Sequence, residues 1–245
     1  MSNIQTPSAI FEDSRVALPL RNNQQKKHGE KPEYYLPEEI VCAVTHAIGA
    51  YLGAAAVVLL VLFAIWSEVQ IPWKIVAGSI FGAAIIILYS ASTLYHAVTN
   101  YRIKKVFQSV DEMAIYIMIA ATYTPFCLVI LRQTNPVLSW TILGTIWGMA
   151  IIGIFAKLFG QQQSKYVTPI PYLVMGWFGL VLIKPLIDHF AFGGFVWLIL
   201  GGVLYSLGVV FYLWRNLPYN HAVWHVFVLA GTIAHFFCIL FYVIM

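Results

Sequence analysis

The chain has 245 residues, of which 60% are hydrophobic and 10% are charged, and its formal net charge is +4. A soluble domain carries about 25% charged and about 45–50% apolar residues, so this composition excludes an ordinary water-soluble globule. It also excludes a disordered chain, which needs low hydrophobicity. The long unbroken apolar runs indicate membrane-spanning helices rather than the short alternating strands of a membrane barrel. The small and dispersed charge gives no reason to expect a nucleic-acid partner.

The first part of the chain differs in character from the rest. Residues 1–38 are polar and interrupted by prolines, and the first apolar run begins too late for a signal peptide. We predict a flexible cytoplasmic tail over 1–38 and an all-α, polytopic membrane domain over 39–245. Glu38 and Glu39 mark its start, where acidic side chains interact favourably with a helix dipole. Seven apolar segments follow, each near the ~20 residues that a helix needs to cross a bilayer: 40–66, 74–97, 110–131, 137–159, 168–187, 193–214 and 220–244.

Lysine and arginine residues determine the predicted orientation. If the N-terminus lies in the cytoplasm, all but three of the 14 basic residues lie on the cytoplasmic side. The exceptions are Lys74, Arg132 and Lys184. The positive-inside rule therefore predicts a multi-pass protein of the cell (inner) membrane with a cytoplasmic N-terminus and with Met245 outside.

Several ionisable residues gather near one level of the predicted bundle. Such residues are costly inside a membrane and are functional candidates. Ser92 and His96 lie four residues apart near the cytoplasmic end of the second segment, and His221 and His225 are spaced likewise at the start of the seventh. Residues four apart share one helix face. The third segment starts from the same side, with Asp111 in its predicted first turn.

These side chains together suggest a catalytic zinc site. Three neutral imidazoles with a fourth position left to water are a known ligand set for zinc, so His96, His221 and His225 are the predicted metal ligands. Asp111 would orient a ligand or accept a proton from the water, and Ser92 would donate a hydrogen bond. Zinc would lower the pKa of the water towards ~7. Each residue alone has a simpler explanation, such as a packed histidine or an acidic group near a helix N-terminus; the set is more specific than any member.

Other polar residues receive other predictions. His46 lies at the same level, and we expect a supporting or packing role for it. His235 follows His225 by ten residues, which turns it away by roughly 80°, so we exclude it from the metal ligands and expect a hydrogen bond between helices. Glu112 is expected to face the loop or the lipid headgroups. The three cysteines lie in apolar runs without CxxC spacing, which predicts small buried side chains: Cys42, Cys127 and Cys238.

Several short motifs together resemble a known family. They are Glu39 with Thr45-His46-Ala47-Ile48-Gly49, Ala91-Ser92-Thr93-Leu94-Tyr95-His96, Asp111 with Ala114-Ile115-Tyr116, Ala121-Thr122-Tyr123-Thr124-Pro125, and the block from Pro218 to Val228 with His235-Phe236. Over about residues 35–245 the chain resembles the hemolysin III family, the bacterial branch of the progestin and adiponectin receptor superfamily. Many bacterial members carry His directly after the aspartate, where this chain has Glu112.

The resemblance implies a fold and a site. It implies seven helices with a cytoplasmic N-terminus, and a zinc ion that the receptor relatives hold with histidines matching His96, His221 and His225. It also assigns the family's aspartate and serine to Asp111 and Ser92. The wider superfamily includes alkaline ceramidases, which hydrolyse lipid amides.

Three functions are weighed from the sequence, and a transporter stays open beside them, although paired broken helices at matching positions in two halves are not evident. The first is a zinc-dependent intramembrane hydrolase of a lipid amide or ester, or a hydrolase-like regulator of membrane lipid homeostasis, with a membrane lipid as substrate or ligand. The second is a non-enzymatic receptor or sensor in which zinc is structural. The third is a cytolytic pore, which the apolar outer halves of the segments disfavour because a pore needs a polar lining. The sequence leaves the lipid and the oligomeric state undetermined.

Overall fold

The computed structural model describes residues 36–160, 167–187 and 190–245, and within them every regular element is helical. Seven helical spans in these residues are long and apolar enough to cross a membrane, which confirms the predicted number. They are α1 (Leu36–Trp66), α2 (Ile71–Ala97), α3 with η1 and α4 (Tyr101–Thr134), α5 (Pro136–Phe159), α6 with η2 and α7 (Pro169–Leu186), α8 (Phe192–Leu213) and α9 with η3 (Asn220–Ile244).

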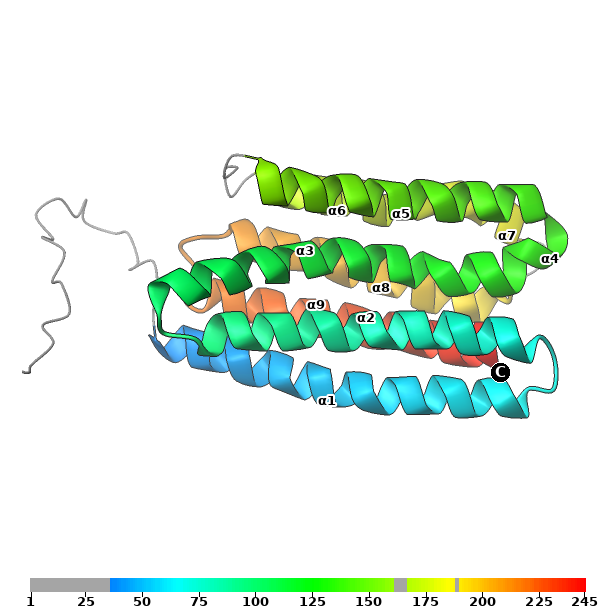
Figure 1. The fold of residues 1–245 in the computed structure, drawn as a ribbon, viewed down its shortest axis with the longest axis horizontal. Coiled ribbons are helices and arrows are strands. Elements are labelled where there is room, and N and C mark those ends of the chain that lie inside the picture. The colour runs from blue at the N-terminus through cyan, green and yellow to red at the C-terminus, as the bar shows by residue number, and fades with distance from the viewer. Residues whose placement is uncertain (1–35, 161–166, 188–189) are drawn as a thin grey trace, which may run out of the picture. The chain divides into compact units, whose positions relative to one another are not determined.

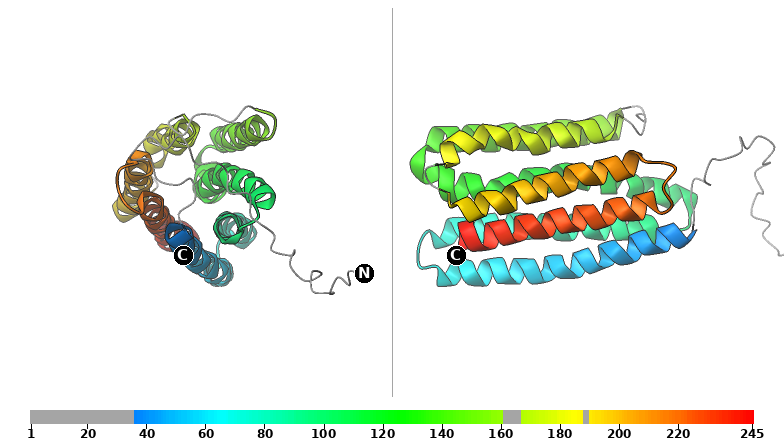
Figure 2. Two further views of the ribbon diagram at one scale, coloured as in Figure 1. Left: turned by 90° about the vertical axis from the view of Figure 1, so that its left-hand side faces the viewer. Right: turned by 180° about the vertical axis from the view of Figure 1, so that it is seen from behind.

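The spans run antiparallel in chain order within residues 36–245 (Figure 1). Seen end-on in Figure 2, α9 lies between α1 and α8, and α2 lies beside α1 and α3. We call the end of the bundle at which α1, α3 and α9 begin the Leu36 end. The α2 helix finishes there, so residues far apart in the sequence meet at this end.

The start of α3 corrects the prediction for Asp111. The helix begins at Tyr101, nine residues before the predicted segment, because the side chain of Asn100 caps it by accepting hydrogen bonds from the backbone N–H groups of Arg102 and Ile103. Asp111 therefore lies in the third turn and not in the first. Its charge does not stabilise the positive end of the helix dipole, an effect that falls off within the first turn.

Small residues allow α1 and α2 to approach closely. A Cβ atom at Gly49 would lie 2.5 Å from Cδ1 of the Tyr89 ring, and one at Gly78 would lie 3.0 Å from Cβ of Leu60. Transmembrane helices associate through such close packing, because lipid tails offer no hydrophobic driving force between helices. This contact brings the first turns of α1 beside the last turns of α2.

The fifth span is broken in its middle. The helix α6 (Pro169–Trp177) gives way to a 3₁₀ turn, η2 (Phe178–Leu182), before α7 (Ile183–Leu186). The Tyr123 hydroxyl of α3 lies 2.7 Å from the carbonyl oxygens of both Met175 and Gly176. These bonds satisfy backbone groups at the break, as an irregular segment at membrane depth requires.

Candidate metal centre

Four side chains that can bind a metal meet at the Leu36 end of the bundle. They are Cys42 of α1, His96 of α2, and His221 and His225 of α9. Each offers one ligand atom, and these atoms all lie within 4.8 Å of one another. The three histidines predicted from the sequence are thus brought together, and a thiol joins them.

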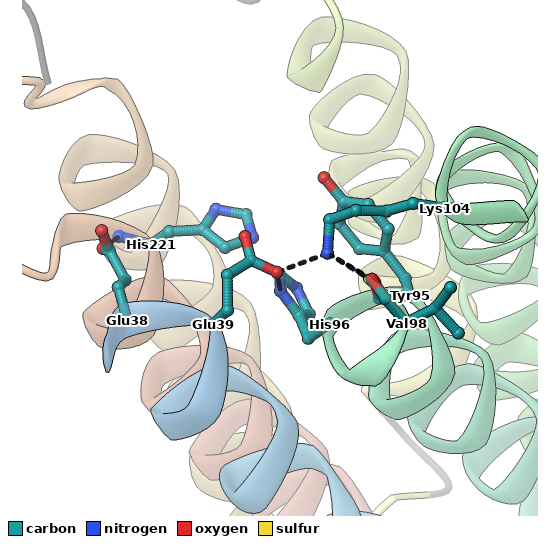
Figure 3. Close-up of polar contacts among 7 residues, drawn as sticks. All are labelled: Glu38, Glu39, Tyr95, His96, Val98, Lys104 and His221. Carbon is teal, nitrogen blue, oxygen red and sulfur yellow. Dashed lines mark hydrogen bonds and ion pairs between the residues drawn. The ribbon is translucent and has the colours of Figure 1, made fainter. Parts of the chain in front are cut away.

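A carboxylate from α1 holds His96 in place. The Glu39 Oε2 atom lies 3.1 Å from His96 Nδ1 and accepts a second hydrogen bond from Lys104 Nζ at 2.6 Å (Figure 3). Lys104 is 5% exposed and also donates to the backbone carbonyls of Tyr95 and Val98. Because Nδ1 carries the proton donated to the carboxylate, His96 Nε2 is left as the nitrogen that can bind a metal.

A second carboxylate fixes the start of α9. Tyr219, the residue before the helix, has a positive φ of 55° and provides no side-chain cap. The Glu38 Oε1 atom instead accepts a 3.0 Å hydrogen bond from the backbone N–H of His221 (Figure 3). Both predicted acidic residues are in the first turn of α1. Beyond their interaction with the helix dipole, they tie α1 to the two histidine-bearing helices.

Buried nitrogens in this cluster have no hydrogen-bond partner in the described part of the chain. These atoms include His96 Nε2 and His225 Nδ1, on residues that are only 5% and 1% exposed. A buried polar atom without a partner costs about 1–3 kcal/mol, so such atoms are rare in folded proteins. Imidazole nitrogens and a thiol are also the donors that zinc prefers. The residues present therefore fit a bound metal ion.

Sequence reasoning included Cys42 only as a buried side chain. It is fully buried, as predicted, and its thiol is free of any disulfide, but it also lies among the three histidines. One signal could have identified it. Cys42 follows Glu39 by three residues and precedes His46 by four, so all three share one face of α1.

The fourth histidine of this region packs against the cluster. The His46 ring stacks on the His225 ring with 3.6 Å between centroids and contacts the Tyr89 ring edge-on at 4.8 Å. It is outside the four-residue group that can hold a metal. These ring contacts confirm the expected packing role of His46.

Ser92 and Asp111 line a cavity that reaches the cluster. The cavity has a volume of about 190 Å³, and its wall also contains His221 and His225, but neither Cys42 nor His96. The Ser92 hydroxyl is fully buried and interacts with the Asp111 carboxyl group. The Asp111 side chain is half-buried and is outside the metal-binding group.

The rest of the cavity is mainly apolar. Along the third span its wall extends from Asp111 of α3 to Phe126 of η1, which is roughly 20 Å of helix. Apolar side chains from α3, α6, η2, α7, α8 and α9 make up most of this length, among them Met118, Leu182 and Val228. The broken fifth span therefore forms one side of a long apolar chamber with polar groups at the Leu36 end.

Two further predicted residues lie apart from the cluster. His235 Nε2 donates a 3.1 Å hydrogen bond to the Leu198 carbonyl of α8, which confirms the expected bond between helices. Its ring packs so closely on Gly201 that a Cβ atom there would overlap it. Glu112 is half-buried; it pairs with Lys157 of α5 and accepts from Gln108 at 3.2 Å. The Glu112 side chain therefore joins two helices.

Known proteins give an independent comparison. The family model described as haemolysin-III related matches residues 34–236. The Hemolysin-3 homolog of Bacillus subtilis (strain 168) is 43% identical over 209 residues, covering 85% of this chain and 96% of the relative. Hemolysin-3 of Bacillus cereus is 43% identical over 210 residues, covering 86% and 94%.

A more distant relative supports the superfamily. The human monocyte to macrophage differentiation factor is 30% identical over 176 residues, covering 68% of this chain and 70% of the relative. The family model spans most of the residues that form the seven helices and includes every member of the cluster. The chain is therefore a multi-pass membrane protein that belongs to the haemolysin-III-related family.

Proposed function

We propose that this protein is a zinc-dependent hydrolase of a lipid amide or ester, embedded in the cell membrane with its Leu36 end towards the cytoplasm. One observation carries the proposal: a single cavity joins metal-binding histidines, a carboxylate and a hydroxyl to a long apolar wall. Such a chamber suits an acyl chain, whose polar linkage would lie at the Leu36 end. The orientation and the cell membrane follow from the distribution of lysine and arginine.

The polar side chains have distinct tasks in this proposal. His96, His221 and His225 hold the metal, which when bound polarises a carbonyl group and lowers the pKa of water. The Asp111 carboxylate accepts the proton of the attacking water and passes it to the leaving amine or alcohol. The Ser92 hydroxyl, which lines the cavity beside Asp111, donates a hydrogen bond to the carbonyl oxygen. The apolar wall excludes water from the acyl chain.

Replacing Asp111 by Asn tests the catalytic role. The amide keeps the size of the side chain but cannot accept the proton, so hydrolysis should fall by about 10²–10⁴-fold. Zinc content should stay unchanged, because the ligand atoms are untouched. The assay follows fatty-acid release from ceramide and from an ester lipid by protein in nanodiscs. Glu112→Gln serves as the matched control, and equal rates for the wild-type protein and Asp111→Asn would refute the proposed role.

The thiol favours a second candidate function. A metal held by four protein groups is typical of structural zinc sites, whereas catalytic sites leave one position to water. With Cys42 beside the three histidines, the protein would be a lipid receptor whose metal stabilises the bundle. Zinc-loaded protein that binds fatty acids in the cavity but hydrolyses neither ceramide nor ester lipids would favour this candidate.

The names of the bacterial relatives point to lysis, and we do not extend that activity to this chain. A pore needs polar groups along its full length. The described cavity is polar at the Leu36 end and mainly apolar beyond it. Release of a trapped dye from liposomes by the purified protein would overturn this judgement.

A further inference from the structure

The metal cluster contains a donor that the three-histidine site does not need. Cys42 Sγ lies within 4.8 Å of one ligand atom on each of His96, His221 and His225. The thiol is fully buried, and the neighbouring atoms His96 Nε2 and His225 Nδ1 are buried without a hydrogen-bond partner. Two observations therefore point to one shared cation: the convergence of four donor side chains, and the lack of a hydrogen-bond partner for one ring nitrogen on each of His96 and His225.

The donor set matches a closed tetrahedral site. Zinc binds thiolate sulfur at about 2.3 Å and imidazole nitrogen at about 2.0–2.1 Å, and structural sites have four protein ligands. We infer that Cys42 is the fourth ligand of the metal, so that the resting site is Cys₁His₃ and its coordination is completed by the protein. This inference rests on the metal centre proposed above. It adds that Cys42 occupies the fourth coordination position of the metal.

The arrangement around the cluster supports this assignment. Cys42 lies on the same face of α1 as Glu39, whose carboxylate orients the ring of His96. The α1 helix thus contributes one ligand, Cys42, and also the group that holds the ligand His96 in place. His46 on that face stacks against His225. On binding, the thiol loses its proton to solvent and the sulfur binds as thiolate, as a coordinating thiol does.

The position of Cys42 has a consequence for the proposed hydrolase. The cavity wall includes His221 and His225 but not Cys42, so the thiol approaches the cluster from outside the chamber. A fourth protein ligand removes the position that a catalytic zinc site leaves to water. With a metal bound in this way, the proposed hydrolysis would require the Cys42 thiolate to give up the fourth position, so Cys42 would restrain the activity of the wild-type protein.

Cobalt substitution tests the inference directly. The full-length protein in detergent is stripped with a chelator and titrated with Co²⁺. The wild-type protein should bind one equivalent and show the near-ultraviolet band of sulfur-to-cobalt charge transfer. Cys42→Ala should lose this band and bind Co²⁺ about tenfold or more weakly, since even loss of a group behind a ligand costs about 10–100-fold. It should also bind added thiocyanate through the vacated position, with a shifted cobalt spectrum.

The matched control is Cys127→Ala, which replaces another fully buried cysteine outside the cluster and should keep the band and the affinity. If the wild-type protein binds cobalt without a sulfur band, and Cys42→Ala binds it equally well, the inference is wrong while the three-histidine centre stands. If the wild-type protein binds no cobalt or zinc at all, the metal centre itself fails. A sulfur band that persists in Cys42→Ala also overturns the assignment.

Discussion

Removal of the Glu39 carboxylate should weaken metal binding without touching a ligand. Glu39 lies 3.1 Å from His96 Nδ1 and so directs Nε2 towards the cluster. Outer partners of this kind raise ligand basicity and fix the ring, and their loss costs about 10–100-fold in metal affinity, or about 1.4–2.7 kcal/mol. We expect this loss for Glu39→Ala and a smaller one for Glu39→Gln, because the amide oxygen still accepts from Nδ1.

The same substitution also leaves a buried cation without its carboxylate. The pair of Glu39 and Lys104 has a 2.6 Å contact, with side chains 17% and 7% exposed. Breaking a buried pair by removing one partner costs about 3–5 kcal/mol. We expect about 3 kcal/mol here, because Lys104 keeps hydrogen bonds to two backbone carbonyls. A lower melting temperature alone would therefore not identify the effect on His96.

Lys104→Met separates the two effects. This variant loses the ion pair and some stability but keeps the carboxylate on His96, so its zinc affinity should stay within about threefold of wild type, a difference under about 0.7 kcal/mol. Affinities are measured by competition with a chromophoric chelator, and stability by thermal unfolding in the same detergent. The reasoning is refuted if Glu39→Ala binds zinc as tightly as wild type, or if Lys104→Met loses as much affinity as Glu39→Ala.

Three further outcomes are expected. His225→Ala should lower the zinc content of purified protein at least about tenfold by elemental analysis; unchanged content would exclude it as a ligand. Gly201→Ala should cost about 1–3 kcal/mol in thermal unfolding through overlap with His235, whereas Gly148→Ala, which meets no neighbour, should be neutral or slightly stabilising; equal melting temperatures would contradict this. Tyr123→Phe should cost about 1 kcal/mol by removing the hydroxyl bonds at the break in the fifth span, and an unchanged melting temperature would disprove their role.

The seven spans were predictable because a bilayer constrains the sequence strongly. Backbone groups in lipid must be satisfied within the segment, so long apolar runs predict helices. This requirement holds only for the part of a helix that lies in lipid. The polar first turns of α3, which precede the apolar segment, were therefore not predicted. Asn100 was the available signal, since asparagine is a favoured N-cap and its side chain accepts hydrogen bonds from the backbone N–H groups of Arg102 and Ile103 in the first turn.

The site was predictable only in part. Spacing of four residues placed Ser92 with His96 and His221 with His225, because such pairs share a helix face. The positions of Glu39 and Cys42, the two residues that α1 brings to the site, were not predictable in this way. Which side of α1 faces α2 and α9 depends on close packing at positions such as Gly49, and a nearly uniform apolar helix has no amphipathic pattern that reveals it. The contacts of Glu39 with His96 and the placement of Cys42 are products of that packing.

The origin of the four donors has a consequence for biogenesis. Cys42 and His96 belong to the first two helices to emerge during synthesis, while His221 and His225 belong to the last of the seven. A nascent chain therefore has only half of its donor atoms until α9 has entered the bilayer beside α1. The proposed metal ion could therefore be bound by all four groups only after α9 has inserted, so its capture would mark the end of insertion.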